Sequence, residues 1–179
     1  MNTALLIIDV QHALCSGEED CFQSQRVIQT INDLSARARA RSLPVILVQH
    51  EELEGQGPLV HGSAAWQLAD GLEVQPQDLR VRKTTRDAFY RTDLLPLLQA
   101  RGIDRVVACG MQTDYCVNAT VRQAHVLGFD VVLAADAHTT VDNGSVSAEQ
   151  IIADHNRQLA RLSSAVARFD VTAAGNIRL

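Results

Sequence analysis

The sequence predicts one doubly wound, Rossmann-like α/β domain over residues 1–179, with a mostly parallel six-stranded sheet and helices on both faces. Short apolar runs alternate with segments of helical periodicity, which is typical of α/β proteins. The runs carry few polar interruptions, as expected for strands that are covered on both faces. The chain has 179 residues, of which 46% are hydrophobic, so a single domain can bury a full core.

The apolar runs mark the expected strands in order along the chain. The first run (ALLIID) is too short for a helix, and the second follows Pro44, which breaks the preceding helical pattern. Gly102 and Gly128 are placed to end the helices before the fourth and fifth runs. Strands are therefore expected at 4–9, 45–48, 79–83, 105–109, 131–135 and 165–169.

Helices are expected where apolar residues recur every three or four positions, as Val27, Ile31, Leu34 and Ala38 do. The same reasoning places further helices at 94–100, 113–127 and 147–162. The long segment 51–71 has a mixed composition with several glycines. We expect it to be a loop that forms a lid or part of a subunit interface.

The overall charge and the absence of several motifs exclude some classes of function. Lys and Arg number 16 and Asp and Glu number 21, so a formal charge of -5 argues against nucleic-acid binding. No apolar run is long enough to span a membrane, and no signal peptide is recognisable, so a cytoplasmic protein is expected. The glycine-rich dinucleotide and phosphate loops are absent, so we expect no cofactor and a small-molecule substrate.

The four cysteines show neither a metal-site nor a redox-motif spacing. In a cytosolic protein we expect reduced thiols, each of them either a small core residue or a reactive group. Cys109 lies inside an expected strand and should belong to the core, and Cys15 and Cys21 are expected to be bystanders. Cys116 is the candidate for a reactive thiol.

Reactive side chains stand at the ends of three expected strands. Asp9 ends the first strand, Lys83 ends the third, and Cys116 follows the fourth. A parallel sheet brings such positions to one edge, where a carboxylate can move a proton, an ammonium can favour thiolate, and the thiolate can attack carbon. Taken singly, such residues are more often a turn residue, a solvated lysine and a core cysteine than catalytic groups.

The local sequence around the candidate nucleophile supports this interpretation. Thr113 is expected to cap a helix, which would put Cys116 in its first turn. Free backbone N–H groups there lower the pKa of a thiol and can bind an oxyanion.

Several motifs together resemble the isochorismatase-like cysteine hydrolases, a superfamily that includes nicotinamidases and other amidases. The similarity extends over nearly the whole chain. The matching motifs are LIIDVQ at 6–11, RK at 82–83 with DAF at 87–89, GMQTDYCV at 110–117, and DA at 136–137. The resemblance implies Cys116 as nucleophile, Asp9 as general base and acid, and Lys83 as support for the thiolate. It also implies a cis peptide at Met111–Gln112 and an oxyanion hole made by the N–H groups of Gln112 and Cys116.

Further residues are candidates to line the substrate pocket, namely Gln11, Trp66, Tyr115 and His138. Gln11 and Tyr115 neighbour the proposed triad, Trp66 lies in the long loop, and His138 follows the fifth strand, where a capping role is an equal alternative. The sequence departs from the superfamily at Asp87, where serine is usual. That residue is either solvated or shapes the pocket.

The sequence favours hydrolysis of a C–N bond in a small amide through a thioester on Cys116. The alternatives are cleavage of a vinyl ether, as in true isochorismatases, which typically lack this cysteine, and a non-catalytic interaction scaffold. Nicotinamidases of the superfamily bind a metal after the second strand, where this chain has His50 and Glu52, with His61 in the loop beyond. That pattern departs from the metal motif, so we expect no metal and no nicotinamidase activity. Separately, the resemblance and the long loop lead us to expect a homo-oligomer (dimer or tetramer).

Overall fold

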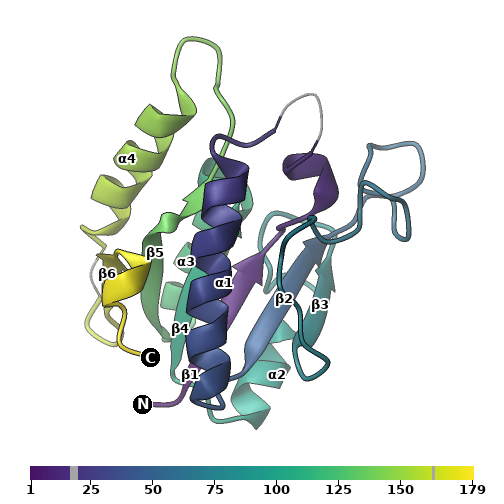
Figure 1. Ribbon diagram of the computed structural model, residues 1–179. Coiled ribbons are helices and arrows are strands. Elements are labelled where there is room, and N and C mark those ends of the chain that lie inside the picture. Colours follow the sequence, from purple (N-terminus) through teal and green to yellow (C-terminus); the bar gives the residue numbers. More distant parts are fainter. Residues whose placement is uncertain (17–19, 163) are drawn as a thin grey trace.

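One six-stranded sheet organises the chain, as the computed structural model shows for residues 1–16, 20–162 and 164–179 (Figure 1). The strand order is β3-β2-β1-β4-β5-β6, and every neighbouring pair is parallel. The chain therefore winds outward in both directions from β1 and β4, which confirms the doubly wound prediction. The strands are β1 Thr3–Ile8, β2 Val45–His50, β3 Leu79–Lys83, β4 Arg105–Met111, β5 Asp130–Thr139 and β6 Phe169–Thr172.

Helices cover both faces of this sheet. Helix α1 packs on one face, and residues of the other three belong to the core on the opposite face (Figure 1). The helices are α1 Ser24–Ala40, α2 Leu94–Ala100, α3 Asn118–Val126 and α4 Ala148–Leu159. None of the helices within the described residues has the length and apolarity needed to cross a membrane.

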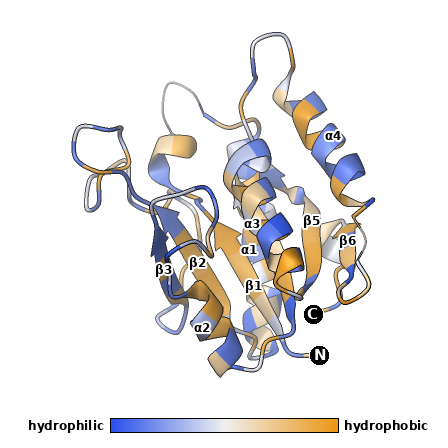
Figure 2. Cartoon of the chain, turned by 180° about the vertical axis from the view of Figure 1, so that it is seen from behind, coloured by the Kyte–Doolittle hydropathy of each residue, from blue (hydrophilic) through white to orange (hydrophobic). Residues whose placement is uncertain are grey.

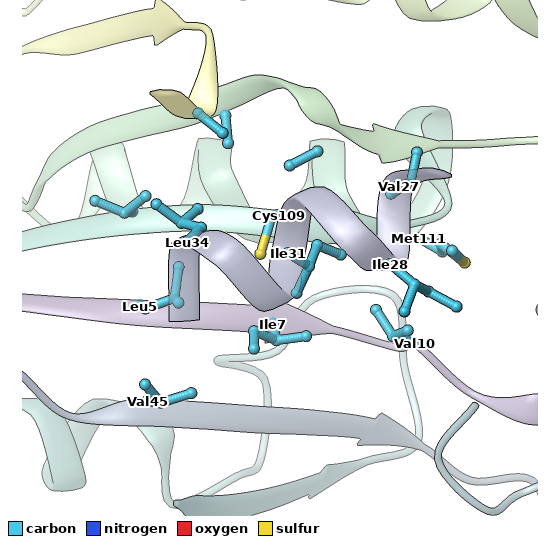
Figure 3. Close-up of a cluster of buried hydrophobic side chains, with 14 of the residues drawn as sticks. Leu5, Ile7, Val10, Val27, Ile28, Ile31, Leu34, Val45, Cys109 and Met111 are labelled. Atoms are coloured by element: carbon cyan, nitrogen blue, oxygen red, sulfur yellow. The ribbon is translucent and has the colours of Figure 1, made fainter. Parts of the chain in front are cut away.

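The central strand β1 shows why its sequence is continuously apolar. Its side chains alternate between the two faces. Leu5 and Ile7 pack beneath α1 (Figure 3), whereas Leu6 and Ile8 belong to the opposite core. All four are essentially inaccessible to water, and burying a side chain of this size contributes about 1.5–3 kcal/mol. The residues of α1 that recur at helical spacing all face this core.

The edge strand β3 differs from the central strands, because Arg80 and Arg82 point to solvent on alternate positions. Figure 2 shows β3 as hydrophilic beside the hydrophobic β2 and β1. Charged side chains on an edge strand discourage pairing with another chain. Lys83, at the end of the same strand, is buried instead.

Several boundaries were predicted wrongly. The fifth strand was expected at 131–135 but runs from Asp130 to Thr139, so His138 lies within it. The sixth strand was expected at 165–169 but runs from Phe169 to Thr172, because Ser164 Oγ accepts the N–H groups of Val166 and Ala167 and forms a turn there. The helix expected at 113–127 is divided into a π-helix, Thr113–Val117, and α3. The π-helix carries Cys116, and such segments are frequent at functional sites.

Candidate active site

Asp9 follows β1 directly and turns the chain at the edge of the sheet. Its backbone has a φ of 51°, a left-handed conformation that Asp adopts more readily than most residues, and its N–H donates to Val48 O at 2.9 Å. The residue is only 1% exposed. The Lys83 ammonium contacts the Asp9 carboxylate, and the Cys116 thiol also interacts with it. This buried carboxylate is therefore placed to receive a proton.

Lys83 reaches Asp9 from the end of β3, two strands away. Strand register places His50 beside Lys83 and Val48 beside Ile8, so the carboxyl ends of β3, β2 and β1 share one edge. The ammonium Nζ lies 2.6 Å from Asp9 Oδ2 and also donates to Thr85 O at 3.0 Å. The Lys83 side chain is wholly buried, so its charge depends on these partners.

Cys116 completes the cluster from the π-helix, and its Sγ lies 3.2 Å from Lys83 Nζ. The other three cysteines are buried, whereas Cys116 is partly accessible. Burial, followed by the negative charge of Asp9, raises the pKa of the Cys116 thiol to about 12, although Lys83 acts in the opposite direction. Burial and Asp9 therefore act against the favoured thiolate that the sequence predicted, and Lys83 acts for it.

Thr113 does not cap the helix, which contradicts the sequence prediction. Its Oγ1 lies 2.8 Å from His138 Nδ1, and His138 Nε2 lies 2.9 Å from Asn156 Oδ1. The Asn156 amide donates to Ala135 O, which orients its oxygen toward the histidine. His138 therefore donates through Nε2 and accepts from the Thr113 hydroxyl. This network ties the start of the π-helix to β5 and α4.

The backbone before the π-helix approaches β1 closely. Gly110 has a φ of 121°, and a Cβ atom there would lie 2.0 Å from Ile8 O. Only glycine fits such a position. The next peptide, Met111–Gln112, is cis. Gln112 then opens the π-helix in extended conformation and faces the Cys116 cavity.

A cavity of about 330 Å³ opens onto Cys116 and Asp9. The predicted residues Gln112 and Tyr115 line it. The remaining lining residues are Leu14, His50, Leu59 and Arg86. The cavity volume lies at the lower end of the range for small-molecule sites.

Three residues predicted to line the pocket lie elsewhere. Gln11 is fully buried, and its side chain accepts from His50 N–H at 2.8 Å and donates to His50 O and Trp66 O. The Trp66 indole packs edge-on against His61 beside a neighbouring cavity of about 540 Å³. His138 is 2% exposed and lies inside the network with Thr113 and Asn156. Gln11 and His138 satisfy structural needs that spacing alone does not reveal, whereas Trp66 lines the neighbouring cavity together with Lys83.

The residues weighed as metal ligands do not converge. His50 Nδ1 lies 3.4 Å from the Lys83 ammonium, the Glu52 carboxylate accepts from Leu59 N–H, and His61 contacts Trp66. Burial, with Lys83 as the next cause, lowers the pKa of His50. Within residues 1–16, 20–162 and 164–179, no three His, Cys, Asp or Glu side chains gather as a metal site. The donor set after β2 does not fit the nicotinamidase metal.

Sequence reasoning missed Arg86 and assigned no role to Leu14 and Leu59. Arg86 stands three residues after Lys83, and that short spacing was the available signal. Asp87, whose place is usually taken by serine, is half-buried, and its Oδ1 accepts from Phe89 N–H at 2.8 Å. It thereby stabilises the turn, as a serine hydroxyl also can.

Comparisons with known proteins agree with this geometry. The family model for the isochorismatase domain matches residues 3–166. Streptothricin hydrolase of Streptomyces noursei is 40% identical over 139 residues, which is 78% of this chain and 50% of that protein. Ureidoacrylate amidohydrolase RutB of Pseudomonas savastanoi pv. phaseolicola is 32% identical over 173 residues, covering 76% and 70%. A crystal structure of an isochorismatase family protein superposes with a TM-score of 0.83 at 36% identity, covering 93% and 96%.

A doubly wound sheet with reactive side chains at the carboxyl ends of its strands defines an α/β enzyme of the open-sheet class. Within that class, this chain belongs to the isochorismatase family of hydrolases. The chain spans about half the length of the streptothricin hydrolase that it matches.

Proposed function

We propose that this protein is a cysteine amidohydrolase that cleaves a C–N bond of a small molecule through a thioester on Cys116. The observation that best supports this is the contact of Lys83 Nζ with both Asp9 Oδ2, at 2.6 Å, and Cys116 Sγ, at 3.2 Å. One relative is named as an amidohydrolase, which agrees with this chemistry. The cysteine also favours an amide over the vinyl ether of true isochorismatases.

The high pKa of Cys116 requires that its proton leave during attack. In the first step, Sγ forms a bond to the carbonyl carbon and the thiol proton passes to the Asp9 carboxylate. The carbonyl oxygen takes the negative charge, and the N–H groups of Gln112 and Cys116 stabilise it. Lys83 holds Asp9 in place and offsets the charge on the sulfur as the bond forms.

The second and third steps return the site to its starting state. Asp9 gives the proton to the leaving nitrogen, the C–N bond breaks, and a thioester remains on Cys116. Water then adds to the thioester carbon and gives a proton to Asp9. The C–S bond breaks, the sulfur regains a proton from Asp9, and the carboxylic acid leaves. No step requires a metal, so EDTA dialysis should leave the rate unchanged.

The test is a screen of small amides for ammonia or amine release, followed by mass spectrometry of the quenched protein. Wild-type protein should accumulate an acyl adduct on the Cys116 peptide, and Cys116→Ala should lose turnover and the adduct. Cys15→Ala, which changes a buried thiol, should keep most of the activity. Full activity in Cys116→Ala, or an adduct on another residue, would refute the assignment.

A further inference from the structure

Arg86 is an exposed residue that lines the Cys116 cavity. It belongs to the loop after β3, and its guanidinium carbon lies 4.3 Å from the centre of the Tyr115 ring. Tyr115 precedes Cys116 in the π-helix, so this cation–π contact positions the guanidinium beside the nucleophile. An arginine stacked in this way is held in place, but the N–H groups at the edge of its guanidinium remain available for hydrogen bonds.

The donors of this guanidinium are unused in the described part of the chain, where Arg86 forms no ion pair and its side chain donates no hydrogen bond. Its neighbour Asp87 points its carboxylate at the Phe89 N–H and does not pair with it. The two surface arginines of β3 behave differently. Arg80 donates to Gln49, and Arg82 pairs with Glu51.

Arg86 also sets the charge of the cavity. Asp9 and Lys83 neutralise each other at 2.6 Å, and burial disfavours protonation of His50. The other lining residues, Leu14, Leu59, Gln112 and Tyr115, are uncharged side chains at neutral pH. The cavity therefore carries one uncompensated positive charge, although the chain as a whole has a formal charge of -5.

We infer that Arg86 is the specificity residue of this site and that the substrate is a small amide carrying a carboxylate, which the guanidinium binds. A planar fork with free N–H groups matches a carboxylate in a bidentate arrangement. Leu14 and Leu59 supply apolar walls for the short carbon chain between the carboxylate and the scissile amide. This inference rests on the proposed function, and its test is separable from it.

The test compares two alkylating reagents of similar size, iodoacetate and iodoacetamide, on Cys116 at about pH 9. Only iodoacetate carries the carboxylate. The rate with iodoacetate is divided by the rate with iodoacetamide, and this ratio is divided by the same ratio for free cysteine. The normalised ratio reports on the anion site without any amide turnover. The normalised ratio should exceed one in the wild type. It should fall about tenfold or more in Arg86→Gln, because hydrogen bonds to charged groups are strong.

Arg91→Gln is the matched control, because Arg91 stacks on Tyr90 at 5.2 Å but lies outside the Cys116 cavity. It should leave the ratio unchanged. In amide assays, Arg86→Gln should lower kcat/KM for carboxylate-bearing amides about 10- to 100-fold and leave their neutral analogues unaffected.

The outcomes separate the two proposals. A normalised ratio near one in the wild type, or an equal ratio in Arg86→Gln, would overturn the role of Arg86 even if amides are hydrolysed. A raised ratio that depends on Arg86, with no amide turned over, would support the anion site and count against the amidohydrolase.

Discussion

Protonation of His138 should limit the acid stability of this protein. The imidazole is buried, accepts from the Thr113 hydroxyl through Nδ1, and donates to Asn156 through Nε2. A second ring proton would face the Thr113 oxygen and add a charge to a buried site, and the effect of burial outweighs the opposing effect of the Asp136 carboxylate. Burial accordingly lowers the pKa of His138 from its ordinary 6.5 to about 4.

The direction and the size of the effect follow from linkage. Because the folded-state pKa lies below the unfolded one, the unfolded chain binds this proton first as the pH falls. The stabilisation is fully present above pH 6.5 and is lost as the pH falls toward about 4. Each pH unit across that interval removes about 1.4 kcal/mol, which gives a loss of roughly 3 kcal/mol. That is a large share of a typical folding free energy of about 5–15 kcal/mol.

Urea unfolding at several pH values between 7 and 4 measures this loss. His138→Gln is the informative variant, because glutamine can accept from Thr113 and donate to Asn156 but does not titrate. Carboxylates contribute equally to both proteins, so the wild type should lose about 3 kcal/mol more than the variant across this range. Replacement of the exposed His61 by Gln should not change the slope. Parallel curves for wild type and His138→Gln would refute the reasoning.

Two further predictions concern the buried ion pair and the close backbone contact. Lys83→Met leaves the Asp9 carboxylate buried without a partner and should cost about 3–5 kcal/mol in urea unfolding, whereas Asp9→Asn combined with Lys83→Met should restore most of it. The single and the double variant should each lose at least about 100-fold in turnover. A double variant no more stable than Lys83→Met would contradict the pairing. Gly110→Ala should fail to give folded protein, because its Cβ would meet Ile8 O at 2.0 Å. Gly128→Ala, with a φ of 91° but open space, should cost only about 1 kcal/mol, and equal thermal stabilities would count against the steric argument.

The sequence allowed the sheet and the meeting of Asp9, Lys83 and Cys116 to be predicted, because a parallel sheet puts strand ends at one edge. It did not allow the side-chain directions beyond those ends to be predicted. Gln11 turns into the protein because Asp9 adopts a left-handed backbone conformation, and His138 points inward because β5 continues to Thr139. These directions depend on backbone turns and strand lengths that hydrophobic periodicity does not encode.

The Cys116 thiol shows a second limit of sequence reasoning. Lys83 and the expected helix start predicted a favoured thiolate, but burial and the negative charge of Asp9 raise the pKa of the thiol. Arg86 was missed for a related reason. Its significance comes from the absence of a partner among the described residues, and a missing partner leaves no trace in a sequence pattern.

The Gln11 side chain has a consequence for how such an enzyme can diversify. One of its three hydrogen bonds fastens the late part of the 51–71 loop, at Trp66, to the segment that follows Asp9, and the other two join it to His50 at the end of β2. The earlier part, which ends in Leu59 at the cavity, is closed separately by Glu52. The residues between these two anchors can therefore be exchanged, lengthened or deleted without displacing Asp9. Selection for a new substrate can act on one short stretch of chain while the chemistry stays intact.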